Sequence, residues 1–287
     1  MPKTIVTHFH PDLDAIMSAW LLVRFDQSQF GDAQFAFCSA GQTYRGEEVD
    51  SDPDTVHVDT GMGRYDHHMP GGEKTCAARL VFQSLQAAGY IDEDDSALRA
   101  MSDFAYEIDT FADCYWPEAE HPRYAFMLHE IIPALHALQI HDNEAVLRAG
   151  FLYLDGVYQF LKNTRHAKEA IQEADREGQT FDSPWGRGIY VTSSAGDVSK
   201  VAQKMGYGIV IIYDPIKKYM KIKTAPKVKF SLRSLYDKIV ELEPLDMWIY
   251  HPSGHIVLNG SDKGPKKPTE LSIEDILGLI GKIEQKS

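Results

Sequence analysis

Short apolar runs and amphipathic stretches alternate through the first third of the chain. Residues 3–6, 34–38 and 55–58 are apolar runs of strand length bounded by polar segments, which is typical of buried strands. Residues 15–24 and 75–88 instead place apolar side chains at helical spacing. Strands that alternate with helices indicate an α/β fold, and we expect these strands to form a parallel sheet.

Helical patterns dominate the middle of the chain. They cover residues 96–111, 121–138 and 143–177, and Pro133 predicts a kink or break in the second of them. We therefore expect the segment 117–177 to extend the first domain with helices.

A domain boundary is expected at residues 178–186, where turn-forming residues concentrate. Beyond it, strands and helices alternate again. The expected strands are 188–192, 209–213, 219–223 and 247–250, and the expected helices are 197–205, 235–242 and 273–280. The sequence thus predicts one domain over residues 1–178 and a smaller α/β domain with a mixed sheet over residues 187–287.

Charge is divided unevenly along the chain. Residues 1–184 carry 13 Lys and Arg against 31 Asp and Glu, and residues 185–287 carry 16 against 11, so the net charges are −18 and +5. The acidic part would suit metal cations and the basic part an anionic ligand. Solvated surfaces of uneven composition would explain the same numbers.

The composition is that of a globular protein. The chain has 287 residues, of which 44% are hydrophobic, and this is enough for a sizeable core. No apolar run approaches the roughly 18 residues of a membrane span, and the N-terminus has no signal-peptide pattern. The 3 cysteines have no spacing typical of a zinc site or a disulfide framework. We therefore expect a cytoplasmic protein with reduced cysteines and no membrane partner.

The first predicted strand leads into a turn that is rich in metal-ligand side chains. His8, His10, Asp12 and Asp14 all lie between this strand and the next predicted helix. Open α/β sheets bind ligands at the carboxyl ends of their parallel strands, which is where this turn lies. Either histidine could be a ligand, and Asp12 could instead only complement the helix dipole.

Three further sites carry the same side-chain types. Asp59 follows the third predicted strand, a triplet at 66–68 lies in the next loop, and Asp109 lies in a predicted helix whose register leaves Asp103 and Asp113 as alternatives. Carboxylates that converge cannot all stay ionised without a cation, so such a set with neutral histidines indicates divalent metal. Oxygen and imidazole ligands without thiolate favour Mn²⁺ or a similar octahedral ion.

These residues resemble motifs of the DHH phosphoesterase superfamily, which is named for the triplet found here at 66–68, Asp-His-His. The segment 8–15 resembles the first motif of that superfamily. In this motif a His and the Asp residues four and six positions later are metal ligands, and the spacing selects His8, Asp12 and Asp14.

Two more motifs extend the resemblance, because Asp59-Thr60 is similar to the second motif and Asp109-Thr110 to the fourth. The resemblance implies two Mn²⁺ ions, with Mg²⁺ or Co²⁺ as alternatives, bridged by Asp59. The implied ligands are His8, Asp12 and Asp59 for the first ion, and Asp14, Asp59, His67 and Asp109 for the second. The implied catalytic group is Asp59, Asp66, His67 and His68, in which Asp66 orients the neighbouring imidazole and His68 faces the substrate phosphate.

Two short segments near the C-terminus carry a weaker resemblance. Residues 230–234 are similar to the Ser-Leu-Arg-Ser strand of the DHH-associated domain, and residues 253–255 to its Gly-rich segment that ends in His. The resemblance implies that His68, Arg233, Gly254 and His255 bind the substrate, with the Arg and His side chains at a terminal phosphate.

The resemblance implies a Mn²⁺-dependent phosphodiesterase that hydrolyses short oligonucleotides or small nucleotides with metal-activated water. An inorganic pyrophosphatase or polyphosphatase would use the same metal chemistry. A catalytically weak, nucleotide-binding regulatory protein would keep the fold and the metals. The segment 117–177 is longer than a minimal DHH domain needs, and its role as a lid, a homodimer surface or padding stays open.

Overall fold

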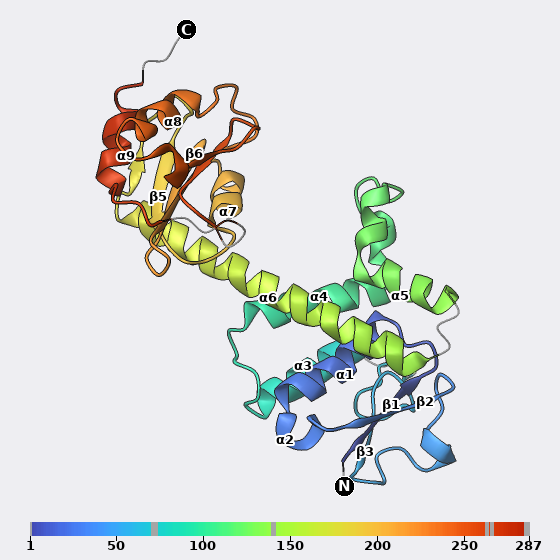
Figure 1. Cartoon of the computed structure of the whole chain (residues 1–287). Helices are drawn as coiled ribbons and strands as arrows, with labels where there is room; N and C mark the ends of the chain where they lie inside the picture. The colour runs from blue at the N-terminus through green and yellow to red at the C-terminus, as the bar shows by residue number, and fades with distance from the viewer. Residues whose placement is uncertain (1, 70–73, 139–141, 262–263, 265–266, 284–287) are drawn as a thin grey trace. The chain divides into compact units, whose positions relative to one another are not determined.

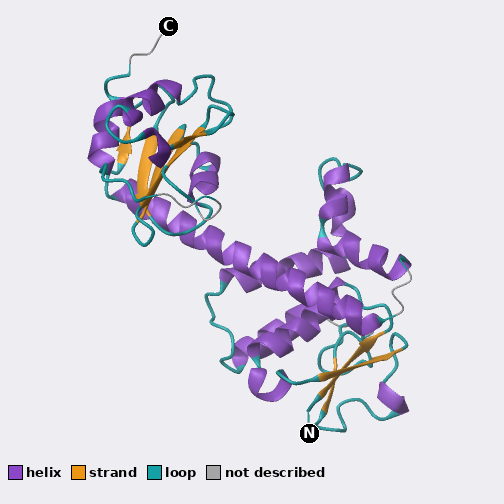
Figure 2. Ribbon diagram, viewed as in Figure 1, coloured by secondary structure: helices purple, strands orange, loops and turns teal. Residues whose placement is uncertain are grey.

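A computed structural model describes residues 2–69, 74–138, 142–261, 264 and 267–283 of the chain (Figures 1 and 2). The chain folds into two compact units, Met1–Gln159 and Phe160–Ser287. Within the described residues, none of the helices combines the length and the apolar character that crossing a membrane requires.

The first unit is built on a parallel three-stranded sheet, as the apolar runs predicted. Its strands are β1 (Thr4–His8), β2 (Gln34–Cys38) and β3 (Thr55–His57), in the order β2-β1-β3. Ile5 and Val6 are fully buried in the central strand. All three strands run in the same direction, so their carboxyl ends meet at one edge of the sheet.

Helix α1 (Leu13–Phe25) lies at the centre of the helical layer. It packs against α3 (Ala77–Ala87) and α4 (Ser96–Asp109), and Ile16, Trp20 and Leu21 are buried on it. The shorter helices of this unit are α2 (Gln27–Phe30), η1 (Tyr44–Gly46), η2 (Ala112–Tyr115), η3 (Pro122–Phe126) and α5 (Leu128–Ala137).

The predicted helix over residues 121–138 is two helices in the structure, η3 and α5. The break is at Met127, whose extended backbone precedes α5, and Pro133 lies inside α5 without ending it. The prediction of a break was therefore correct, but its position was wrong.

The long predicted helix is present as α6 (Asn143–Arg176), and it contributes to both units. Near its start, Phe151 packs edge-on against Phe35, and Asp155 accepts hydrogen bonds from Trp20 and Arg24. Near its end, a buried cluster of the second unit includes Ala167, Ile171 and Ala174 of this helix. The division between the units therefore falls inside α6, whereas the turn-forming residues had placed a boundary after it.

The second unit contains a mixed sheet, as the sequence predicted, and this sheet has six strands. In spatial order the strands are β4 (Thr180–Phe181), β5 (Gly188–Thr192), β6 (Ile209–Asp214), β7 (Tyr219–Thr224), β9 (Ile256–Leu258) and β8 (Ile249–Tyr250). Strands β5 and β6 are parallel, and the other neighbours are antiparallel.

The two faces of this sheet are covered by different helices. Helices α8 (Arg233–Val240) and α9 (Ile273–Ile280) pack with Ile211, Ile222 and Val257 on one face. Helix α7 (Val198–Lys204) and the end of α6 pack on the other face, over β5 and β6. The short helix η4 (Leu245–Met247) ends at the first residue of the predicted strand 247–250, and β8 covers its last two residues.

Candidate metal centre

The turn after β1 places its carboxylates through the start of α1. Asp12 is the N-cap of this helix, and its Oδ1 accepts a hydrogen bond of 3.1 Å from the amide of Ala15. Asp14 lies in the first turn and is buried. Asp12 can therefore cap the helix and also bind a cation, because a capping carboxylate keeps a second oxygen free.

Asp14 is held by the start of a second helix. Its two oxygens accept hydrogen bonds of 2.7 and 2.8 Å from the backbone amides of Ala77 and Ala78 in the first turn of α3. Burial, followed by the charge of Asp59, nevertheless raises the pKa of Asp14. No sequence motif indicated this pair of backbone donors, since amides carry no side-chain signature.

Asp59 lies at the centre of the cluster, two residues after the end of β3. Its backbone has a φ of 54°, in the left-handed region, and its amide donates a hydrogen bond of 2.9 Å to the carbonyl of Tyr65. Its side chain is buried, and its two oxygens face different histidines. Oδ2 is 3.3 Å from Nε2 of His8, and Oδ1 is 3.4 Å from Nε2 of His67.

Among the described residues, three groups of side chains in this region have ligand atoms close enough to hold one cation each. They are His8, Asp12 and Asp59; Asp14, His67 and Asp109; and Asp59, His67 and His68. The structure thus brings all of the sequence-predicted metal ligands together, and Asp59 belongs to two of the groups.

The contacts of His8 indicate that its second nitrogen carries either a proton or a metal ion. Nδ1 lies 2.9 Å from the carbonyl oxygen of Phe9, and because a carbonyl only accepts, Nδ1 carries the proton. Nε2 then faces the carboxylates of Asp59, at 3.3 Å, and Asp12, at 4.0 Å. A bare lone pair in that position would be repelled, so Nε2 requires either a second proton or a metal ion.

Two buried atoms of the cluster lack hydrogen-bond partners within the described structure. They are Oδ1 of Asp59 and Nε2 of His67, which face each other without hydrogen-bond geometry. Buried polar atoms are normally paired, so the pair fits a site that an ion completes. The donor set of carboxylate oxygens and imidazole nitrogens also fits a divalent cation such as Mn²⁺.

Without metal, the cluster retains protons that a metal ion would replace. Burial disfavours the charged ring of His8, but the hydrogen bond to Asp59 and the neighbouring groups outweigh it and raise its pKa to about 9. Burial raises the pKa of Asp12 and of Asp109. Asp59 is the exception, because its histidine neighbours overcome burial and lower its pKa.

The sequence left the register of α4 open, and in the structure Asp109 is the carboxylate that faces the cluster. Its Oδ1 is 3.7 Å from Nε2 of His67. Asp103 instead pairs with Arg79 at 2.8 Å, and its side chain is 62% exposed. Asp113 lies in η2, beside His129 and Glu130.

His8 and His10 have different surroundings, which resolves the choice that the turn left open. The ring of His10 stacks on that of His136 with centroids 4.8 Å apart, and its backbone amide donates to Asn143. His8 is therefore the histidine of this turn that faces the carboxylates.

Asp66 contacts the second histidine of its triplet and not the first. Its Oδ1 lies 2.8 Å from Nδ1 of His68, and its Oδ2 accepts a hydrogen bond of 2.6 Å from the amide of Met62. Asp66 was expected to orient the imidazole next to it in the sequence, but it contacts the following one instead. Asp66 fixes the ring of His68, whose side chain is 58% exposed.

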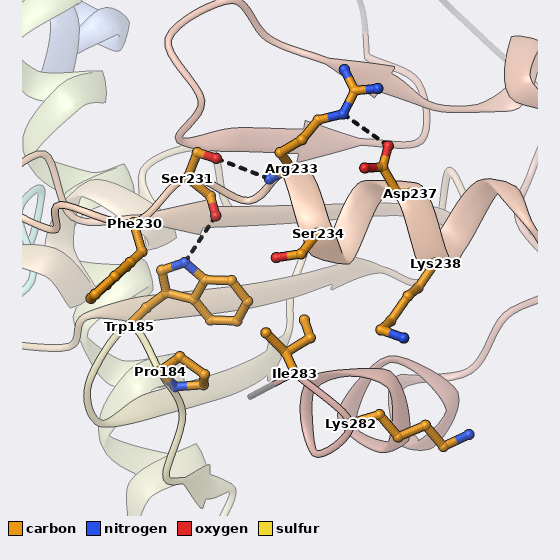
Figure 3. A pocket seen from close by; sticks show the side chains of 10 residues that line it. All are labelled: Pro184, Trp185, Phe230, Ser231, Arg233, Ser234, Asp237, Lys238, Lys282 and Ile283. Carbon is orange, nitrogen blue, oxygen red and sulfur yellow. Dashed lines mark hydrogen bonds and ion pairs between the residues drawn. The ribbon is translucent and has the colours of Figure 1, made fainter. Parts of the chain in front are cut away.

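The remaining predicted site residues lie in the second unit. Arg233 begins α8 and pairs with Asp237 at 2.8 Å, as Figure 3 shows, and its side chain is 61% exposed. His255 bonds through Nδ1 to the hydroxyl of Thr224 at 2.8 Å. Gly254 has a φ of 78°, and a Cβ there would lie 3.0 Å from Cβ of Ser231, so the two predicted segments are adjacent.

Arg233 lines a pocket of about 530 Å³. Figure 3 shows that Trp185 and Ile283 lie on its other side, and that Ser231 accepts from the Trp185 indole through its backbone oxygen. Lys238 and Lys282 make the lining cationic. The sequence did not indicate Trp185, which lies in the predicted boundary segment.

Comparisons with known proteins show limited similarity. No protein-family model matches the chain, and no curated protein matches it in sequence. One similar solved structure is the exonuclease RecJ bound to manganese, with 15% identity and a TM-score of 0.29 over 91% of this chain and 86% of that chain. Another is RecJ in complex with Mg²⁺ from Thermus thermophilus, with 14% identity and a TM-score of 0.29 over 91% of this chain and 47% of that chain. Superpositions this loose carry no argument about function, which therefore depends on the site itself.

Proposed function

We propose that the protein is a metal-dependent phosphodiesterase that hydrolyses short oligonucleotides or small nucleotides. The observation that carries this proposal is the position of Asp59, whose two oxygens face His8 and His67 in separate groups of ligand atoms. One carboxylate shared by two cation sites is the arrangement that two-metal phosphoryl transfer uses.

The proposed ligands divide as the motifs implied. His8, Asp12 and Asp59 would hold one ion, and Asp14, Asp59, His67 and Asp109 the other. The donor set favours Mn²⁺, with Mg²⁺ or Co²⁺ as alternatives. When bound, the ions would activate water and stabilise the charge that develops on phosphate oxygens.

The proposed role of His68 is to contact the substrate. Its Nδ1 is held by Asp66, which leaves Nε2 on a largely exposed ring for a phosphate oxygen. A protonated ring would donate a charge-assisted hydrogen bond there. Asp66 supports this role, because its contact with Nδ1 fixes the orientation of the ring.

The second unit would supply cationic groups for recognition. Arg233 pairs with Asp237, an exposed carboxylate on its own helix, and such pairs contribute little, on the order of 0.2–1 kcal/mol. A phosphate could therefore replace Asp237 at small cost. The nearby Lys238 and Lys282 also favour a second candidate substrate, inorganic pyrophosphate or polyphosphate.

A hydrolysis screen with Mn²⁺ tests both candidates. We expect a dinucleotide such as pApA to be cleaved, and Asp59→Ala to abolish the cleavage. Asp103→Ala is the matched control, because it removes an exposed carboxylate of the same unit, and its activity should stay within about twofold. Cleavage of pyrophosphate but not pApA would select the second candidate. Undiminished cleavage by Asp59→Ala would refute the proposed site.

A further inference from the structure

One face of the second sheet carries two lysines beside apolar residues. Lys221 and Lys223 alternate on β7 with the buried Met220 and Ile222, so both point to the face opposite α8 and α9. The register gives the same result, since Lys221 pairs across the sheet with Ile212 of β6.

The neighbouring strand completes an apolar surround for these lysines. Leu258 of β9 lies opposite Lys221, and Ile256 lies opposite Lys223. On this face, α7 and the end of α6 pack over β5 and β6. The part that includes β7 and β9 forms a pocket of about 580 Å³, a volume typical of small-ligand sites.

The two lysines have no carboxylate partner within ion-pair distance in the part of the chain that the structure describes. Asp214 also lines the pocket, but its Oδ1 accepts hydrogen bonds from the amides of Ile216 and Lys217. Burial, and then the charge of Lys221, lower the pKa of Lys223, and Asp197 opposes this shift. Two half-buried like charges on one face favour an anion between them.

The rim of the pocket adds hydrogen-bonding groups. Ser193 and Ser194 follow the carboxyl end of β5, which is parallel to β6, and both line the pocket. In open α/β sheets, ligands commonly bind outside the carboxyl ends of parallel strands. The pocket thus combines cations, hydroxyls and an apolar floor of Ile212, Ile256 and Leu258.

We infer that this pocket binds one nucleotide unit, with its phosphate at Lys221 and Lys223 and its sugar and base over the apolar floor. The choice of a nucleotide over other phosphorylated molecules rests on the proposed function. The pocket is separate from the one lined by Arg233, with which it shares no lining residue. The nucleotide could be free, as a product, or part of an oligonucleotide strand.

Calorimetric titration in EDTA, at low salt, tests the inference without metal chemistry. The probes are AMP for the free nucleotide and pApA for the strand, with inorganic phosphate and pyrophosphate as base-free ligands. We expect Lys221→Ala/Lys223→Ala to weaken nucleotide binding about tenfold or more, because two charge-assisted contacts are lost. Tight AMP binding would identify the free nucleotide as the occupant, and a preference for pApA would identify the strand.

The controls separate charge, folding and the other pocket. Lys227→Ala/Lys229→Ala makes the same charge change at exposed lysines of the same unit outside the pocket, and should change affinity less than twofold. Lys221→Arg/Lys223→Arg keeps the charge and should keep binding. Asp59→Ala should also bind normally, so a failed metal site would leave this result intact.

Three results would overturn the inference. In the first, Arg233→Ala abolishes AMP binding and Lys221→Ala/Lys223→Ala does not change it. In the second, the two double lysine variants weaken binding equally. In the third, pyrophosphate binds as tightly as AMP. The last would mean that the apolar floor contributes nothing.

Discussion

The candidate metal centre of the first unit consists of buried carboxylates and histidines, whereas the pockets of the second unit are lined by more exposed cationic side chains. Asp14 and Asp59 are 3% and 4% exposed, and their positions are fixed by backbone hydrogen bonds or by loop geometry. Arg233, by contrast, is exposed, and its ion-pair partner Asp237 is also at the surface. Buried carboxylates that converge need a cation, whereas exposed cations can exchange one anion for another at little cost. The difference suggests that chemistry depends on the first unit and recognition on the second.

The largest effect is expected at a buried ligand. His67→Ala should lower Mn²⁺-dependent kcat by roughly a thousandfold or more, because its Nε2 faces Asp14, Asp59 and Asp109. His166→Ala removes an exposed histidine from α6 and should leave kcat within about twofold. Steady-state kinetics on pApA measures both variants. Similar activity of the two would contradict the assignment of the chemistry to the first unit.

A second effect concerns protons in the metal-free centre. The folded pKa of His8 is about 9, above its ordinary value of 6.5, so its contribution to stability is present below pH 6.5 and is lost as pH rises through about 9. In EDTA, Tm should therefore be lower at pH 9 than at pH 6.5, and His8→Ala should show a smaller decrease. An equal decrease in both proteins would contradict the assignment of this proton.

The Mn²⁺ affinity of the wild type should rise by up to about tenfold per pH unit for each proton displaced.

A smaller, different effect is expected at the exposed cation. Arg233→Ala should raise KM for the substrate about tenfold or more and leave Mn²⁺ affinity unchanged, since a bidentate phosphate contact would be lost. Asp237→Asn removes the present partner of Arg233 and should leave KM the same or lower. Should Arg233→Ala change metal affinity instead of KM, the proposed division of roles would be wrong.

The smallest effect is expected on stability, from a side chain added at Gly254. Gly254→Ala adds a Cβ at a φ of 78°, close to Ser231, and should lower the free energy of unfolding by about 1–3 kcal/mol. Gly278→Ala is the matched control inside α9, where a Cβ meets nothing within 4 Å, and it should be neutral or stabilising by up to about 1 kcal/mol. Denaturant unfolding compares them, and equal stabilities would show that the turn at Gly254 tolerates a side chain.

Much of the fold could be predicted from apolar periodicity. Strands β1 and β5 and the long helix α6 have strong patterns, and the structure contains all three. Strand β9 was missed because its three residues, Ile256–Leu258, are too few for a pattern and are extended only through pairing with β7 and β8. The division inside α6 was missed because helical periodicity does not record which unit a turn packs against.

The composition of the candidate centre could be predicted from motif spacing, but its internal geometry could not. The spacing selected His8, the resemblance to the fourth motif implied Asp109, and the structure places both near Asp59 or His67. The pairing of Asp66 with His68 depends on the loop between Asp59 and His68, where hydrogen bonds to Met62 and Tyr65 fix the chain. These contacts depend on the backbone conformation of the loop, which the spacing of the motifs does not specify.

The most direct test of the central claim is the number of Mn²⁺ ions that the first unit binds. Isothermal titration of the metal-free, full-length protein at pH 8 measures this number together with the affinity. We predict two ions per chain for the wild type and at most one for Asp59→Ala, since Asp59 is a proposed ligand of both ions. Failure of the wild type to bind Mn²⁺ at millimolar concentration, or an unchanged stoichiometry in Asp59→Ala, would contradict a metal centre built around this carboxylate.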